Sequence, residues 1–321
     1  MQLSEIQSLA QTIRANVSKV IVGKEDVIDK LLIALIASGH ILLEDVPGTG
    51  KTLLAKAVAK SLNCSFKRIQ FTPDLLPSDL SGINYFNQKL SEFEFRPGPL
   101  FTNILLADEI NRATPRTQSS LLECMEERQI SIDGETRGLE QPFLVIATQN
   151  PVENQGTFPL PEAQLDRFLF KVRMGYPTTE EGLDIMKRFK DANPLEAIVI
   201  VAGTDEIIAA QRHYSQVTVS DELLRYMLQI VEKTRYHSEV ATGVSPRGSQ
   251  ALLKAVQVQA LLQGRDFATP DDVKAMAGPV LAHRIMVKGS FRSRHLAAES
   301  IVDSILQEVT VPAESELVKQ E

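Results

Sequence analysis

Short apolar runs, each about the length of a buried strand, recur along the first half of the chain. They cover residues 41–43, 65–69, 104–107, 143–147 and 169–172. Segments with helical periodicity separate most of these runs; Leu54, Val58 and Leu62, for example, repeat at four-residue spacing. Strands that alternate with helices favour a parallel sheet with helices on both faces. The first half therefore predicts an α/β fold with a five-stranded parallel sheet between helices.

Helical periodicity dominates after residue 174, and strand-like runs become rare. Residues 175–179 (GYPTT) have the composition of a turn or a linker. Apolar stripes at 223–231 and 251–262 predict helices, and Thr269-Pro270 predicts another helix start, because Thr caps helices and Pro favours the first helical position. We therefore expect an α/β domain over residues 1–175, an all-α domain over 176–312 and a polar tail over 313–321.

Composition and charge narrow the class of protein. The chain has 321 residues, of which 43% are hydrophobic and 23% charged, as in ordinary globular proteins of two domains. The 34 basic and 41 acidic residues give a net charge of −7, which counts against a nucleic-acid partner. No run approaches the roughly 20 apolar residues of a membrane span. The two cysteines, Cys64 and Cys124, suggest neither a disulfide framework nor a zinc site, so we expect a cytoplasmic protein.

A glycine-rich loop follows the first apolar run. Its residues are Asp45, Val46, Pro47, Gly48, Thr49, Gly50, Lys51 and Thr52. They match a Walker A loop, except that Asp45 stands in place of the first glycine. In such loops glycines let backbone N–H groups surround a phosphate, and the N-terminus of the next helix adds its positive dipole end. Lys51 is the candidate contact to the β- and γ-phosphates, and the hydroxyl of Thr52 is a candidate Mg²⁺ ligand.

Two acidic residues follow the third apolar run. Asp108 and Glu109 come directly after residues 104–107, the arrangement of a buried strand that delivers carboxylates to a nucleotide pocket. Asp108 is the candidate to hold Mg²⁺ through its waters, and Glu109 to polarise the attacking water. Acid pairs are common at strand ends, so the prediction depends on the Walker A loop upstream. The chain has no later Asn-Lys-x-Asp sequence for guanine recognition, which favours ATP over GTP.

Two more polar residues stand beside predicted strands. Asn150 follows the fourth run and is a candidate to orient the catalytic water or contact the γ-phosphate. The alternative is a turn-forming Asn-Pro pair. Arg167 precedes the fifth run, a place where an isolated arginine is ordinarily a solvated surface residue.

Seven segments within residues 20–285 together resemble AAA+ ATPases, and more closely the MoxR family of that class. They are LLEDVPGTGKT, RIQFTPDLLPSDLSG, FEFRPGPLF, ADEINRATPRTQSSLLECMEE, ATQNP, LPEAQLDRF and GVSPRG. The resemblance implies an AAA+ P-loop core followed by an all-α lid. It also implies a Mg²⁺-dependent ATPase.

The same resemblance implies roles for single residues. Asn150 resembles the sensor 1 residue, Arg167 the arginine finger supplied to a neighbouring subunit's ATP, and Arg247 the sensor 2 residue of the lid. Val22 and Gly23 resemble the segment beside the adenine. Arg247 has an alternative interpretation as a surface charge at a helix start. A finger supplied by a neighbour completes the active site only in a ring, and the family typically forms hexamers.

Two stretches do not serve the predicted sheet. Residues 83–95 and 129–141 both have the pattern of hairpins, the second around Asp133-Gly134. By resemblance they match insertions that face the ring pore in this clade, and the alternative is that they are plain surface loops. Tyr85, Phe86 and Phe93 are candidates for contact with a client protein.

The favoured function is ATP hydrolysis in a ring, coupled to chaperone-like remodelling or maturation of protein complexes. Family resemblance adds metal-cofactor insertion and a partner with a von Willebrand factor A domain. One alternative is a nucleic-acid motor of the same clade, against which the net charge argues. Another is a nucleotide-dependent regulatory module that does not hydrolyse ATP, which the presence of Glu109 and Arg167 disfavours.

Overall fold

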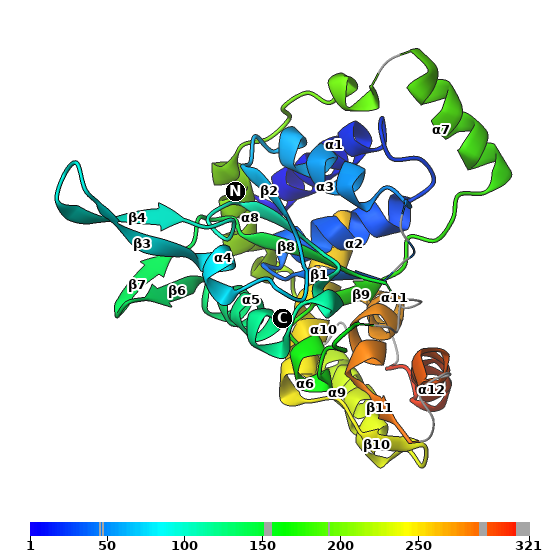
Figure 1. Cartoon of the computed structure of the whole chain (residues 1–321). Helices are drawn as coiled ribbons and strands as arrows, with labels where there is room; N and C mark the ends of the chain where they lie inside the picture. Colours follow the sequence, from blue (N-terminus) through cyan, green and yellow to red (C-terminus); the bar gives the residue numbers. More distant parts are fainter. Residues whose placement is uncertain (45, 47, 151–155, 192, 289–293, 313–321) are drawn as a thin grey trace. The chain divides into compact units, whose positions relative to one another are not determined.

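The computed structural model describes residues 1–44, 46, 48–150, 156–191, 193–288 and 294–312 (Figure 1). They divide into two compact units, each described by itself. The sheet unit comprises residues 12–160 and 172–208, and the helical unit comprises 1–11, 161–171 and the chain from 209 onward. The predicted domain border near residue 175 stays a prediction, because compactness alone does not define a domain. The predicted polar tail, 313–321, lies outside the described residues.

Five strands form the main sheet, in the order β2-β5-β8-β1-β9. They are β1 (Ile41–Glu44), β2 (Phe66–Gln70), β5 (Ile104–Asp108), β8 (Leu144–Gln149) and β9 (Phe170–Val172). The pairs β2–β5, β5–β8 and β8–β1 are parallel. All five strands overlap the apolar runs of the sequence, so the predicted fold, a five-stranded parallel sheet between helices, is confirmed.

Helices cover both faces of this sheet, with α2 and α3 on one side and α5 on the other (Figure 1). The helices of the sheet unit are α2 (Glu25–Ile36), α3 (Lys51–Ser61), α4 (Pro77–Ser81), η1 (Ile110–Arg112), α5 (Pro115–Glu127), α7 (Thr179–Asp191) and η2 (Pro194–Ala197). Two helices, α1 (Leu3–Val17) and α8 (Thr204–His213), include residues of both units. Strand β5 is buried along Ile104–Ala107 because helices lie over both of its faces.

The strand register places the polar ends of three strands together. Glu44 of β1 pairs with Gln149 of β8, and Ala107 of β5 pairs with Ala147 of β8. The carboxyl ends of β1, β8 and β5 therefore meet at one edge, where ligands of open α/β sheets ordinarily bind.

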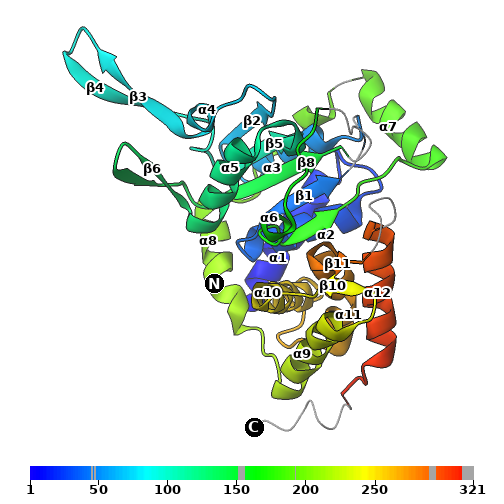
Figure 2. The same cartoon turned by 60° about the horizontal axis from the view of Figure 1, so that its bottom comes forward.

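Two antiparallel hairpins extend from the sheet unit, in the two segments that the sequence singled out (Figure 2). One pairs β3 (Gly82–Asn87) with β4 (Glu92–Pro97), and the other pairs β6 (Gln129–Ile132) with β7 (Glu135–Gly138). Asn84 Nδ2 donates to Asp133 Oδ2 at 2.7 Å, and the Arg137 guanidinium lies 4.2 Å from the centre of the Phe95 ring. These contacts join the two hairpins to each other.

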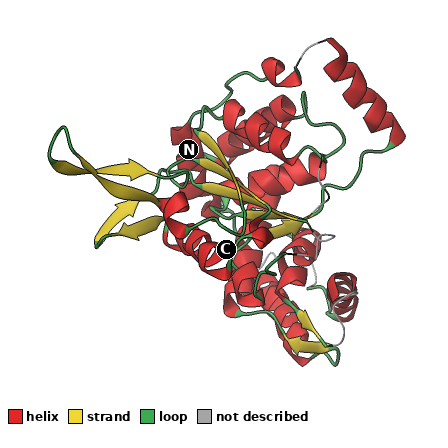
Figure 3. Cartoon of the chain, viewed as in Figure 1, coloured by secondary structure: helices red, strands yellow, loops and turns green. Residues whose placement is uncertain are grey.

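The helical unit is built mainly of helices (Figure 3). Its elements are α6 (Glu162–Leu165), η3 (Tyr214–Gln216), α9 (Asp221–Tyr236), β10 (Val240–Thr242), α10 (Pro246–Leu262), α11 (Pro270–Leu281), η4 (Ala282–Arg284), β11 (Met286–Val287) and α12 (Arg294–Glu308). Both apolar stripes became helices, α9 and α10. Helix α11 begins at the predicted Thr269-Pro270, where Thr269 N donates to Asp272 Oδ2 at 2.8 Å. Among the described residues, every helix is too short or too polar to cross a bilayer.

Candidate functional site

The glycine-rich loop connects β1 to α3, as the Walker A pattern predicts. Gly48 and Gly50 have φ angles of +87° and +93°, in the left-handed backbone region that residues other than glycine rarely adopt. The Lys51 ammonium donates to the Val46 carbonyl at 3.1 Å. Asp45 and Pro47, both predicted to belong to this site, lie outside the described residues. Helix α3 begins at Lys51, so its N-terminus faces the loop.

Asp108 ends strand β5 and is held on both carboxylate oxygens. Oδ1 accepts a hydrogen bond from Thr148 Oγ1 at 2.6 Å, and Oδ2 accepts one from Arg68 Nη2 at 2.7 Å. Thr148 Oγ1 also accepts a hydrogen bond from the backbone N–H of Glu109, at 2.8 Å. Strand β8 thus fixes the position of both acids through one hydroxyl group.

Glu109 has a left-handed backbone, with φ of +56°, which turns the chain sharply at the end of β5. Its Oε2 accepts hydrogen bonds from Gln70 Nε2 at 2.7 Å and from Arg112 Nη1 at 3.0 Å. The carboxylate is therefore oriented from two directions, by β2 and by η1.

Asn150 directly follows β8 and is 7% exposed. Its carbonyl oxygen accepts a hydrogen bond from Asn111 Nδ2 at 3.4 Å. The structure therefore brings the end of β8 next to η1, which begins one residue after Glu109.

Gly23, predicted to lie beside a nucleotide base together with Val22, also has a left-handed φ, of +66°. A side chain at this position would collide with Glu181 of α7, whose Oε1 lies 2.0 Å from where a Cβ would be. The next residue, Lys24, forms an ion pair with Glu181 at 3.9 Å. This segment is thus in contact with α7 inside the sheet unit.

The two predicted arginines belong to the helical unit. Arg167 is half-buried and follows α6, and Arg247 is exposed at the second residue of α10. The structure thus groups the loop, Asp108, Glu109 and Asn150 in one unit, and Arg167 with Arg247 in the other.

Comparison with known proteins assigns the chain to a family. Residues 40–170 match a model of the ATPase family associated with various cellular activities, AAA, and residues 232–305 match a model of the AAA lid domain. The chain is 39% identical to chaperone MoxR1 of Mycobacterium tuberculosis, over 96% of this chain and 84% of that one. It is 32% identical to protein MoxR of Paracoccus denitrificans, over 93% and 95%. The chain belongs to the MoxR family of AAA+ ATPases.

Two further relatives extend over nearly the whole chain. An uncharacterized protein of Bacillus subtilis, YeaC, is 51% identical over 95% of both chains. A crystal structure of a protein from Cytophaga hutchinsonii superposes with a TM-score of 0.89, at 38% identity over 97% of both chains. As a MoxR-family ATPase, the chain carries the predicted P-loop core and helical lid.

The sequence pattern missed several residues at the carboxyl edge of the MoxR sheet. Glu44 is 7% exposed and receives hydrogen bonds from Gln149 Nε2 at 2.7 Å and Arg173 Nη2 at 3.2 Å. Its place directly before the glycine-rich loop was the available signal. Arg68 and Gln70 were also missed, although their spacing of two residues puts both side chains on one face of β2.

Proposed function

We propose that this MoxR-family ATPase binds ATP and Mg²⁺ at the carboxyl edge of its sheet and hydrolyses ATP in an oligomeric ring. The observation that carries the proposal is the grouping of the glycine-rich loop with Asp108 and Glu109. The loop offers backbone N–H groups and Lys51, which together suit a triphosphate. The acids stand at the end of β5, separated from β1 by β8 alone.

The donors at this edge fit magnesium. Mg²⁺ prefers oxygen ligands, keeps several waters and is ordinarily bound by one or two carboxylates and substrate phosphates. Asp108 supplies a carboxylate whose position Thr148 fixes, and Thr52 supplies a hydroxyl group in the first turn of α3. The ion would neutralise phosphate charge. Among the described residues, no three His, Cys, Asp or Glu side chains lie together in a way that could hold a metal.

Each side chain then has one task in hydrolysis. Lys51 exchanges the Val46 carbonyl for phosphate oxygens when ATP binds. Glu109 accepts a proton from the attacking water, and Asn150 orients that water. Arg167 stabilises the transferring phosphoryl group in the neighbouring subunit.

In the same proposal, Arg247 contacts the bound nucleotide, so that the position of the lid depends on whether nucleotide is present. Val22 and Gly23 lie beside the adenine of the bound ATP.

Replacing Lys51 tests the binding site. Lys51→Ala is expected to lose ATP binding, with affinity falling by at least about tenfold, because a hydrogen bond to a charged group contributes about 1.5–3 kcal/mol. Titration with a fluorescent ATP analogue measures the affinity. Lys60→Ala is the control, since Lys60 is exposed in the last turn of the same helix. Normal ATP affinity in Lys51→Ala would remove the Walker A assignment.

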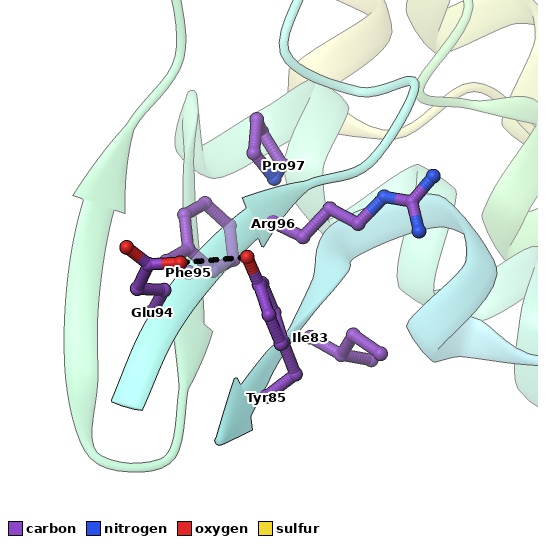
Figure 4. A pocket seen from close by; sticks show the side chains of 6 residues that line it. All are labelled: Ile83, Tyr85, Glu94, Phe95, Arg96 and Pro97. Atoms are coloured by element: carbon purple, nitrogen blue, oxygen red, sulfur yellow. Dashed lines mark hydrogen bonds between the residues drawn. The ribbon is translucent and has the colours of Figure 1, made fainter. Parts of the chain in front are cut away.

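We further propose that the two hairpins contact a client protein. Phe86 is 51% exposed and Phe93 is 73% exposed, and their rings pack edge-to-face at 5.4 Å. Figure 4 shows the hollow on the same hairpin, lined by Ile83, Tyr85, Glu94, Phe95, Arg96 and Pro97.

Tyr85 donates to Glu94 at 2.6 Å in this hollow. That bond lowers the pKa of the Glu94 carboxyl and raises the pKa of the Tyr85 hydroxyl. Exposed aromatic side chains beside fixed polar groups are typical of protein-binding surfaces.

The chaperone designation of MoxR1 supports a protein as the client. We propose remodelling or maturation of protein complexes, including metal-cofactor insertion, in the cytoplasm and with a von Willebrand factor A domain partner. The ring is proposed to be a hexamer. The net charge of −7 agrees with a protein client better than with nucleic acid.

A matched pair of substitutions tests the client surface. Phe86→Ser on the hairpin and Phe267→Ser in the helical unit each replace a phenylalanine that is 51% exposed. Both are placed in a Glu109→Gln background, which is expected to hold ATP, and proteins captured from a cell extract are identified by mass spectrometry. We expect Phe86→Ser to lose the captured proteins and Phe267→Ser to keep them. Equal capture by both variants would contradict a client surface on β3–β4.

A further inference from the structure

Arg68 is fixed on one oxygen of Asp108, the residue proposed to hold Mg²⁺. It lies on β2, the strand next to β5 at one end of the sheet order. Its Nη2 donates to Asp108 Oδ2 at 2.7 Å, and its Nε donates to the same oxygen at 3.2 Å. Nη2 also donates to Gln70 Oε1 at 3.1 Å, which helps to orient the guanidinium. Two donors of Arg68 are therefore directed at a single carboxylate oxygen.

The hydrogen bonds to Asp108 leave its carboxylate little capacity for further donors. Each oxygen of an ionised carboxylate accepts about two hydrogen bonds. Oδ2 already accepts two from Arg68, and Oδ1 accepts one from Thr148 Oγ1 at 2.6 Å. A magnesium ion that is held through its waters needs the same acceptor positions, because those waters donate hydrogen bonds to the carboxylate. Arg68 and the hydrated ion therefore compete for Oδ2.

The charge of Arg68 strengthens this competition. The guanidinium and Mg²⁺ are both cations, and two cations beside one carboxylate repel each other. The Asp108 side chain is only 14% exposed, so salt screens the repulsion less than it would at an open surface. The guanidinium also offsets the negative charge of Asp108, which would otherwise repel the phosphates of metal-free ATP. The same arginine thus disfavours the metal and favours the bare nucleotide.

Arg68 can leave Asp108 without disturbing the sheet. Its side chain is 48% exposed, so the released guanidinium is hydrated. The two strands are joined by their backbones: Gln70 pairs with Asp108 in the β2–β5 register, and Phe71 N donates to the Asp108 carbonyl at 2.8 Å. These contacts do not involve the Arg68 side chain. The arginine can therefore move away while β2 and β5 stay in place.

We propose that Arg68 controls the access of Mg²⁺ to the ATP site: it occupies Asp108 until the metal displaces it. Arg68 thereby sets the Mg²⁺ concentration at which the site holds Mg²⁺ together with ATP. The inference rests on the proposed function, in which Asp108 holds the ion. It adds that ATP can enter without metal, because Arg68 neutralises Asp108 in the meantime.

Arg68→Gln tests this exchange, because glutamine is uncharged and suits an exposed position. Arg14→Gln is the matched control: Arg14 is 44% exposed and forms an ion pair with Asp29 at 3.1 Å, within the same sheet unit. The measurement is the affinity for a fluorescent, non-hydrolysable ATP analogue, first in EDTA and then as Mg²⁺ is added. It reports binding and requires no turnover.

Two effects of opposite sign are expected in Arg68→Gln. The Mg²⁺ concentration at the midpoint of the titration should fall by roughly tenfold, because the ion no longer displaces a charge-assisted hydrogen bond. The affinity for the analogue in EDTA should weaken by roughly tenfold, because the charge of Asp108 is no longer offset. A general structural defect would weaken the binding of both metal and nucleotide. Arg14→Gln should match wild type, and Arg68→Lys, which keeps the charge, should restore the affinity in EDTA.

An unchanged Mg²⁺ midpoint in Arg68→Gln, or weaker binding of both metal and nucleotide, overturns the exchange. If the analogue binds too weakly in EDTA to be measured, the Mg²⁺ midpoint alone decides. Should Arg68→Gln unfold at a lower temperature than Arg14→Gln, Arg68→Met repeats the comparison with a side chain that keeps the apolar stem.

Asp108→Asn separates this inference from the proposed function. In an Asp108→Asn background, Arg68→Gln should change neither quantity, because the two side chains act on each other. If Asp108→Asn keeps the wild-type Mg²⁺ midpoint, the proposed metal site itself is rejected. If Asp108→Asn shifts that midpoint and Arg68→Gln does not, only the role of Arg68 is rejected.

Discussion

Glu109→Gln is expected to bind ATP with near-normal affinity and to lower kcat by about 10²–10⁴-fold, the usual contribution of general base catalysis. Glutamine has the same shape and keeps an oxygen that accepts hydrogen bonds from Gln70 and Arg112. The backbone turn at φ +56° and the bond to Thr148 do not depend on the side chain. The substitution therefore removes the proton acceptor and leaves its surroundings in place.

Phosphate release under saturating ATP measures kcat, and equilibrium titration measures ATP affinity. Glu127→Gln is the control, because this glutamate is exposed at the end of α5. A Glu109→Gln protein that retains more than a tenth of the wild-type kcat would show that another group takes the proton.

Arg167→Ala is expected to lower kcat by about 10³–10⁵-fold, the range known for arginine fingers, while ATP still binds. Phosphoryl transfer gathers charge on the γ-phosphate oxygens, and a fixed guanidinium stabilises that charge. Arg167→Lys should be nearly as slow, because an ammonium group lacks the planar fork of donors. Arg225→Ala, at an exposed position of α9, is the control.

Mixing two inactive variants identifies which subunit provides the arginine. A Lys51→Ala subunit is expected to lose ATP binding but still carries Arg167, whereas an Arg167→Ala subunit is expected to bind ATP but lacks this arginine. If Arg167 acts on the neighbour's ATP, mixed rings recover part of the phosphate release that neither variant shows alone. Absence of recovery in rings that form normally would place the action of Arg167 within its own subunit.

The sequence predicted those parts of the molecule whose signals are local. Apolar runs gave the five strands, because a strand buried on both faces needs consecutive apolar residues. Gly48, Gly50, Asp108 and Glu109 were found because each motif lies within a few consecutive positions. Their roles remain predictions, as do those of Asn150, Arg167 and Arg247.

Contacts between distant residues were beyond reach of the sequence pattern. Arg284 looks like an ordinary arginine at the end of a helix, and only the fold brings it within 2.6 Å of Asp166. The same holds for Arg173, which follows β9 and meets Glu44 across the sheet edge. Periodicity reports which side of an element is buried, and it carries no information on which buried polar groups meet.

The contacts between the two hairpins have a mechanical consequence. A single two-stranded ribbon bends easily, since neither edge is supported by another strand. Asn84 with Asp133, and Arg137 with Phe95, connect one ribbon to the other. A force applied to the tip of the β3–β4 hairpin, near Phe86 and Phe93, is then shared with the β6–β7 hairpin through these contacts. The pair therefore resists bending more than two separate ribbons would.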